Sequence, residues 1–84
     1  MTFRAKAYID DMHEMSFFIA QLNKHDINPS VHGSHIFIHI EGESLESIQV
    51  VLTTFDSLKD KDGKNEFSFT LEQSFKERPV RRSP

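Results

Sequence analysis

The chain has 84 residues, with 10 Lys and Arg against 13 Asp and Glu, so its formal charge at pH 7 is -3. This length allows one domain, and a domain of this size buries only about 60% of the surface that its unfolded chain exposes. The absence of cysteine excludes disulfides, thiolate metal sites and a cysteine nucleophile. No apolar run approaches the roughly 20 residues of a membrane span, and residues 1–11 lack the long apolar segment of a signal peptide, so we expect a soluble cytoplasmic protein.

Residues 3–9 alternate between apolar and polar side chains, which predicts a half-buried strand. The inward side chains are expected to be Phe3, Ala5, Ala7 and Ile9. Asp11 suits an N-cap, and Glu14 follows at the spacing of a capping box, so we expect a helix over residues 12–25. Met12 lies at the margin of its apolar stripe. The members of that stripe are Met15, Phe18, Ile19 and Leu22.

Residues 30–41 contain the clearest turn signal in the chain. Gly33-Ser34 is typical of a two-residue hairpin turn with glycine first. In this register, one side of the hairpin carries Val31, Ile36, Ile38 and Ile40. The other side carries His32, His35, Phe37 and His39. A slip of one residue would bury the histidines and expose the isoleucines, so the register is well specified.

A second helix and a last strand are expected in the C-terminal half. Gly42 ends the preceding strand, and Ser44 is a suitable N-cap for a helix over residues 45–59. The side chains that this helix should bury are Leu45, Ile48, Val51, Leu52, Phe55 and Leu58. Residues 60–63 predict a stop and a turn. Residues 66–74 alternate again, and the inward side chains are expected to be Phe67, Phe69 and Leu71.

The order strand, helix, strand, strand, helix, strand predicts an α+β fold of the ferredoxin-like, split βαβ type. Two helices on one face of a four-stranded antiparallel sheet would bury every apolar stripe at once. Right-handed crossovers place the first and third strands in the centre, and the opposite sheet face stays uncovered. This single domain is predicted to cover residues 1–75. Residues 76–84 hold four basic residues against one acidic residue and are expected to form a disordered basic tail.

The stretch FIAQLNKHDINPSV, followed by HIFIHIEG and a second helical pattern, resembles the small regulatory ACT domains. The resemblance covers about residues 3–72 and implies the same order of elements. It also implies a sensor of small effectors, which would bind where the first strand meets the first helix. RNA-recognition domains share the ferredoxin-like fold and stack bases on aromatic residues of the two central strands. Tyr8 and Phe37 occupy comparable positions here.

The sequence carries no motif that points to a reaction. It has no P-loop, no GxSxG nucleophile motif and no dinucleotide-binding fingerprint. His32 and His35 are expected to face each other across the turn, but two imidazoles without a third ligand make a poor zinc site. His39 lies about 13 Å along the strand from His35, too far to join the same ion. We therefore expect no catalytic residue, no metal and no cofactor, and a protein that is not an enzyme.

The leading hypothesis is a small binding or regulatory protein, of the inhibitor or adaptor type, that acts by protein contact. Acidic residues gather around the second helix, where their negative surface would compete for a basic, nucleic-acid-binding surface of a partner. Phe17 lies nearly opposite the apolar stripe of its helix and suits an anchor. The expected partner-binding residues are Phe17, Glu43, Glu46, Asp56, Asp60, Tyr8, Phe37 and His39. Ordinary solvated surface is the simpler reading of the same residues.

Two other functions stay open. The uncovered sheet face would suit single-stranded nucleic acid, because aromatic side chains there lie next to cations. Its contact residues would be Arg4, Lys6, Tyr8 and Phe37. The acidic body argues against this alternative, and small-effector sensing of the ACT kind is the other. An uncovered sheet face also suits a homodimer that packs face to face.

Overall fold

The computed structural model describes residues 1–42, 44–59 and 62–72. The elements are β1 (Thr2–Tyr8), α1 (Met12–Lys24), β2 (Ser30–His32), β3 (His35–Glu41), α2 (Leu45–Asp56) and β4 (Glu66–Glu72). The proposed contacts at Glu43 and Asp60, the end of the predicted domain and the basic tail over residues 76–84 lie outside the described residues.

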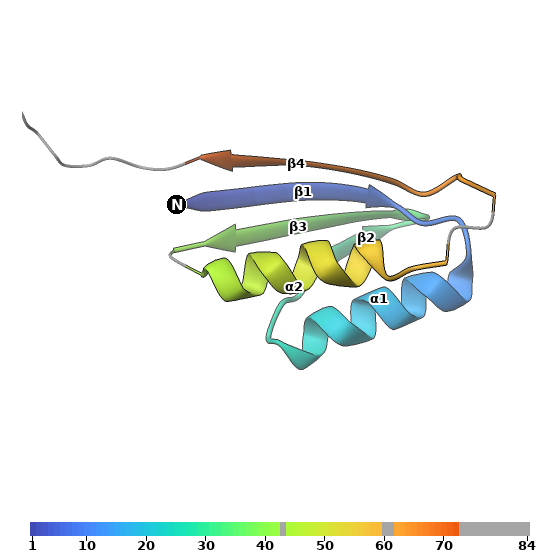
Figure 1. Cartoon of the computed structure of the whole chain (residues 1–84), viewed down its shortest axis with the longest axis horizontal. Coiled ribbons are helices and arrows are strands. Elements are labelled where there is room, and N and C mark those ends of the chain that lie inside the picture. Colours follow the sequence, from blue (N-terminus) through green and yellow to red (C-terminus); the bar gives the residue numbers. More distant parts are fainter. Residues whose placement is uncertain (43, 60–61, 73–84) are drawn as a thin grey trace, which may run out of the picture.

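The four strands form one antiparallel sheet in the order β2-β3-β1-β4, and both helices lie on the same side of it (Figure 1). This order and the βαββαβ arrangement are those of the ferredoxin-like fold, so the predicted α+β architecture is confirmed. The first and third strands are central, as predicted. In the part of the chain that the structure describes, neither helix has the length and apolar character that crossing a bilayer requires.

β1 lies inside the sheet, because β3 pairs with one of its edges and β4 with the other. Its inward side chains are buried, as the alternation predicts: Phe3, Ala5, Ala7 and, just after the strand, Ile9. Ala5 and Ala7 are small, so they leave room for larger helix side chains at the centre of the interface. The rest of the buried core comes from Phe18, Leu22, Ile27, Ile36, Ile38, Ile48 and Val51.

The start of α1 confirms the predicted N-cap and corrects the predicted capping box. The Asp11 carboxylate accepts hydrogen bonds from the backbone N–H groups of His13 at 2.7 Å and Glu14 at 3.4 Å. The Glu14 carboxylate accepts a hydrogen bond from the Asn65 amide at 3.1 Å. Asn65 also accepts one from the backbone N–H of Asp10 at 3.0 Å. Glu14 and Asn65 therefore tie the start of α1 to the segment before β4.

The hairpin between β2 and β3 forms in the predicted register. Gly33 has a φ of +65°, in the left-handed region that favours glycine, as a turn with glycine first requires. The paired residues are Ser30 with Phe37, Val31 with Ile36, and His32 with His35. Ile36 and Ile38 are therefore buried against the helices, and His39 is exposed on the opposite face.

Five apolar side chains that were expected in the core or at its margin are exposed: Met12, Val31, Leu45, Phe69 and Leu71. Met12 and Leu45 are the first residues of their helices, and helical side chains point back toward the N-terminus, beyond the packed turns. Val31 lies on the three-residue edge strand β2. Phe69 and Leu71 lie on the other edge strand, β4, whose far end no described element covers well enough to bury them.

α2 ends at Asp56, earlier than predicted. The backbone N–H of Ser57 bonds to the carbonyls of Thr53 and Thr54, and that of Leu58 bonds to Phe55 at 3.1 Å. The last of these joins residues three apart, which tightens and closes the final turn. At the other end, Ser44 holds the N-cap position, but its hydroxyl donates to the Ser47 hydroxyl at 2.9 Å.

Adjacent phenylalanines on α1 give a test of this packing. Phe18 is fully buried and Phe17 is 46% exposed. We expect Phe18→Ala to lower the free energy of unfolding by about 3–5 kcal/mol, because it leaves a cavity in the core. Phe17→Ala, which makes the same change in helix propensity, should cost less than about 1 kcal/mol. Urea denaturation followed by circular dichroism measures both, and equal losses would contradict this orientation of α1.

Candidate functional site

The side of the sheet that faces away from the helices forms a continuous polar and aromatic surface, called here the open face. The strand register aligns its side chains in four rows across β3, β1 and β4, and the row at the start of β1 is Glu41, Thr2 and Glu72. The other three rows are His35, Tyr8 and Glu66; Phe37, Lys6 and Ser68; and His39, Arg4 and Thr70. The two central strands thus bring together the residues that were predicted to contact nucleic acid, Arg4, Lys6, Tyr8 and Phe37.

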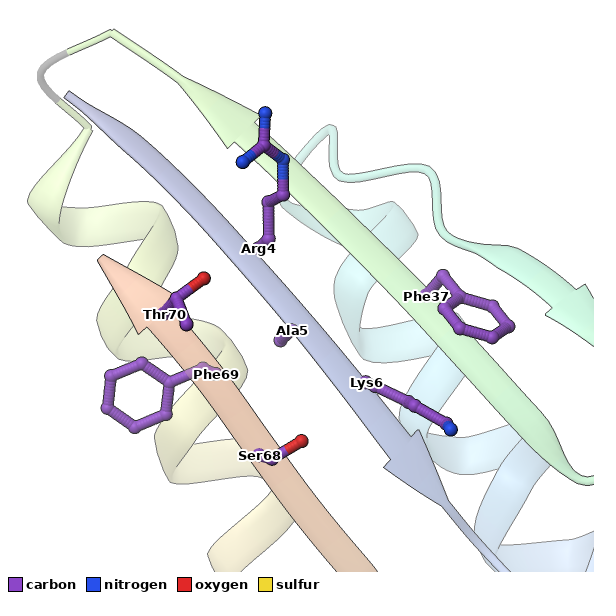
Figure 2. Close-up of a pocket in the computed structure, with 7 residues that line it drawn as sticks. All are labelled: Arg4, Ala5, Lys6, Phe37, Ser68, Phe69 and Thr70. Carbon is purple, nitrogen blue, oxygen red and sulfur yellow. The ribbon is translucent and has the colours of Figure 1, made fainter. Parts of the chain in front are cut away.

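Ring contacts organise the middle of the open face. The Tyr8 and His35 ring centroids lie 5.2 Å apart, and those of His32 and Phe37 lie 5.6 Å apart. The Lys6 ammonium lies 5.9 Å from the Phe37 ring centroid, a cation–π contact worth about 0.5–1 kcal/mol at an exposed site. Figure 2 shows Lys6 and Phe37 beside a hollow between β1, β3 and β4. Phe37 remains 40% exposed, so its ring is accessible to a ligand.

Carboxylates lower the positive potential of the same face. The Arg4 guanidinium lies 3.6 Å from the Glu72 carboxylate, and His39 Nε2 lies 3.1 Å from Glu41 Oε2. These side chains are more than half exposed, so each pair contributes at most about 1 kcal/mol. Glu66 adds a third carboxylate to the face. The open face therefore offers one arginine and one lysine, Arg4 and Lys6, against the carboxylates of Glu41, Glu66 and Glu72, a poor balance for binding phosphates.

The helix side of β4 carries a row of apolar side chains that is half-buried at Phe67 and exposed beyond it. Phe67 packs against Phe55 of α2, with ring centroids 4.9 Å apart. Phe69 lies 5.4 Å from the Phe3 ring and 6.0 Å from the Phe67 ring, yet it is 48% exposed. Leu71 is 43% exposed. Figure 2 shows the Phe69 ring directed away from Lys6 and Phe37. Phe69 and Leu71 are called here the apolar edge.

The backbone of β4 adds a second feature to the apolar edge. Within the described residues, β4 pairs with β1 alone, so it forms one border of the sheet (Figure 1). Alternate residues of an antiparallel strand direct both N–H and C=O to the same side, so part of the β4 backbone faces away from the sheet. The other border strand, β2, has three residues, whereas β4 has seven. β4 is therefore the longer edge onto which another strand could pair.

The residues predicted to bind a partner fall on three separate surfaces. Tyr8, Phe37 and His39 lie together on the open face. Phe17 is exposed on the outer side of α1. Glu46 and Asp56 are exposed at opposite ends of α2, about 15 Å apart along its axis.

The apolar edge was missed at the sequence level, because alternation assigns Phe69 and Leu71 to the helix side of the sheet. It does not say how far a helix extends over them. The predicted strand order already placed the last strand at the edge of the sheet, and this position could have indicated that some of its inward side chains would be exposed. The exposed first and last residues of this strand, Glu66 and Glu72, were not among the predicted partner-binding residues.

The junction of β1 and α1, where the ACT resemblance places an effector, holds a polar hollow. It is lined by Asp10, Asp11, Glu14, Lys59, Asp62, Lys64 and Asn65. Asp11 caps α1, and Glu14 bonds to Asn65, so both carboxylates already have structural roles. In the part of the chain that is described, no three His, Cys, Asp or Glu side chains are grouped to hold a metal ion. Effector sensing stays a prediction.

Truncation of Phe69 tests whether the apolar edge is dispensable for folding. We expect Phe69→Ala to lower the free energy of unfolding by about 1–2 kcal/mol, because a half-exposed ring loses little buried area and two ring contacts. Phe67→Ala is the control and should lower the free energy of unfolding further, since the Phe67 ring packs against Phe55 of α2. Urea denaturation gives both values. A loss for Phe69→Ala as large as that for Phe18→Ala would show that the ring belongs to the core.

Comparison of the chain with protein-family models, with curated proteins and with solved structures gives no match.

Proposed function

We propose that the chain is a small non-enzymatic binding protein that acts by contact with another protein through β4. The observation that carries this proposal is the apolar edge, where two neighbouring large side chains remain exposed on a long border strand. Single exposed apolar residues are common on protein surfaces, but adjacent ones beside a strand edge that no described strand pairs favour an interaction site. We place this contact in the cytoplasm, in keeping with the cysteine-free composition.

The charge of the chain supports a basic partner. Acidic residues exceed basic ones by 13 to 10, and Glu66 and Glu72 stand at the two ends of β4. Opposite charge speeds the encounter of two proteins and disfavours wrong partners. A role as inhibitor or adaptor follows if the basic surface of the partner otherwise binds nucleic acid. Phe17, Glu46 and Asp56 would then lie outside the main contact.

Single-stranded nucleic acid on the open face is the second candidate. It is favoured by the exposed Phe37 ring beside Lys6 and by Tyr8, which lies two residues from Lys6 on the same face of β1. The Arg4–Glu72 pair and the further carboxylates of the face count against it. Protein contact therefore ranks first.

Site-resolved photo-cross-linking tests the protein contact. A benzophenone amino acid replaces Phe69, Phe17 or Phe37 in separate variants, which are irradiated in lysate of the source cells. We expect a discrete protein adduct from position 69 that is absent at 17, because only the apolar edge enters the contact. High salt should weaken the adduct, since the partner is basic. No protein adduct at any of the three positions would contradict the proposal.

Titration with nucleic acid separates the two candidates. We expect fluorescence anisotropy with labelled oligo-dT and oligo-U to show no saturable binding below about 0.1 mM, the weak end of nonspecific binding, at physiological salt. The physical reason is the carboxylate content of the open face. Salt-sensitive binding that is tighter than this and is lost in the double variant Tyr8→Ala, Phe37→Ala would instead assign the face to nucleic acid.

A further inference from the structure

We infer that β4 captures an extended segment of the partner as a fifth strand of the sheet, and that this segment alternates apolar with polar residues and carries a basic residue at each end. The inference rests on the proposed function and names the chemistry of the partner. It follows from the two sides of β4, which present different side chains to a neighbouring strand. Phe69 and Leu71 lie on the helix side, and Glu66 and Glu72 lie on the open face.

The backbone supplies the general attraction. An added strand would satisfy the N–H and C=O groups that β4 directs away from β1, as occurs when peptides extend a sheet. These main-chain bonds form with any sequence, so specificity has to come from side chains. Directly opposite side chains on paired strands lie about 4.5–5.5 Å apart, close enough to contact. The side chains of the added strand would therefore contact the apolar and polar side chains that alternate along β4.

That alternation sets three requirements on the partner segment. Its helix-side residues must be apolar, because they would cover the exposed parts of Phe69 and Leu71. Its open-face residues between the ends can be small and polar, opposite Ser68 and Thr70. Its ends must be basic, opposite Glu66 and Glu72. At Glu72 the added basic residue would share the carboxylate with Arg4, which lies 3.6 Å away. These two carboxylates are six residues apart, about 20 Å along the strand, so the segment needs about seven residues.

A second copy of this chain meets these requirements poorly. The antiparallel register that pairs all seven residues of β4 with a second β4 is centred on Phe69. It places Glu66 opposite Glu72 of the other copy, and it does so at both ends. Like charges directly opposite each other destabilise a strand pair. The charges of β4 therefore favour a basic segment from another protein over self-association.

A synthetic probe can carry all three features. The capped peptide Lys-Val-Thr-Val-Thr-Val-Lys places valines on one side and lysines at both ends of the other. Its residue order is the same in both directions, so it suits parallel and antiparallel pairing. Two controls isolate the features: a peptide with glutamate in place of both lysines, and a permuted peptide of the same composition whose alternation is broken.

The binding measurement uses the full, isotope-labelled chain at physiological salt. We expect the basic probe to shift the backbone NMR signals of residues 66–72 and to slow amide exchange at alternate β4 positions. The acidic and permuted peptides should each bind at least about tenfold more weakly, a difference of about 1.4 kcal/mol. Equal binding of the permuted peptide, or shifts centred on Lys6 and Phe37, would overturn strand addition.

Charge reversal in the protein supplies the matched test. Glu66→Lys should weaken the basic probe about tenfold and strengthen the acidic peptide, which restores an opposite pair. Glu46→Lys makes the same change at an exposed residue of α2 and should alter neither peptide by more than about twofold, because Glu46 lies on a helix and faces no residue of the added strand. Equal effects of the two variants would show that only net charge matters and would overturn the inference.

Three further results distinguish failure of this inference from failure of the proposed function. Sedimentation that shows a dimer of the free chain, with β4 amides protected, would assign the edge to a second copy and overturn the inference. Cross-links from position 69 to a protein, without β4 protection by the basic probe, would retain the protein contact and reject strand addition. Absence of both the cross-links and probe binding would reject both proposals.

Discussion

The fold depends on β1, which is paired along both edges and buries every inward side chain. Phe3, Ala5 and Ala7 define the face of the sheet that packs against the helices. The neighbouring strands β3 and β4 must place their apolar side chains on the same face while they keep their hydrogen bonds to β1. A shift of one residue in any pair would turn apolar side chains to water. The Gly33 turn secures the pairing on the β3 side.

This arrangement leaves the sheet with two very different surfaces. On the helix side, the core is centred on β1 and β3, where helix and strand side chains are fully buried. On the open side, no described element covers the sheet, and the exposed side chains pair locally, as Lys6 does with Phe37 and Arg4 with Glu72. A small domain has little further apolar material with which to cover either surface.

β4 occupies the boundary between these two surfaces. One of its sides continues the core through Phe67 and then emerges into solvent at Phe69 and Leu71. Its other side contributes Glu66 and Glu72 to the open face. The glutamates at its two ends would lie opposite each other in a strand pair of two copies, so the same residues that would disfavour this pairing would select a basic partner.

The sequence by itself determined the order of the elements, the inward side of each strand, the hairpin register and the Asp11 cap, because each follows from local periodicity or from neighbouring residues. It separated buried Phe18 from exposed Phe17 for the same reason. Only the tertiary structure decided how far the helices cover the sheet, and with it the exposure of Phe69 and Leu71. It also decided the tie from Asn65 to the start of α1, which joins groups more than 50 residues apart in the chain. Periodicity states which way a side chain points, and the position of distant elements decides whether anything lies over it.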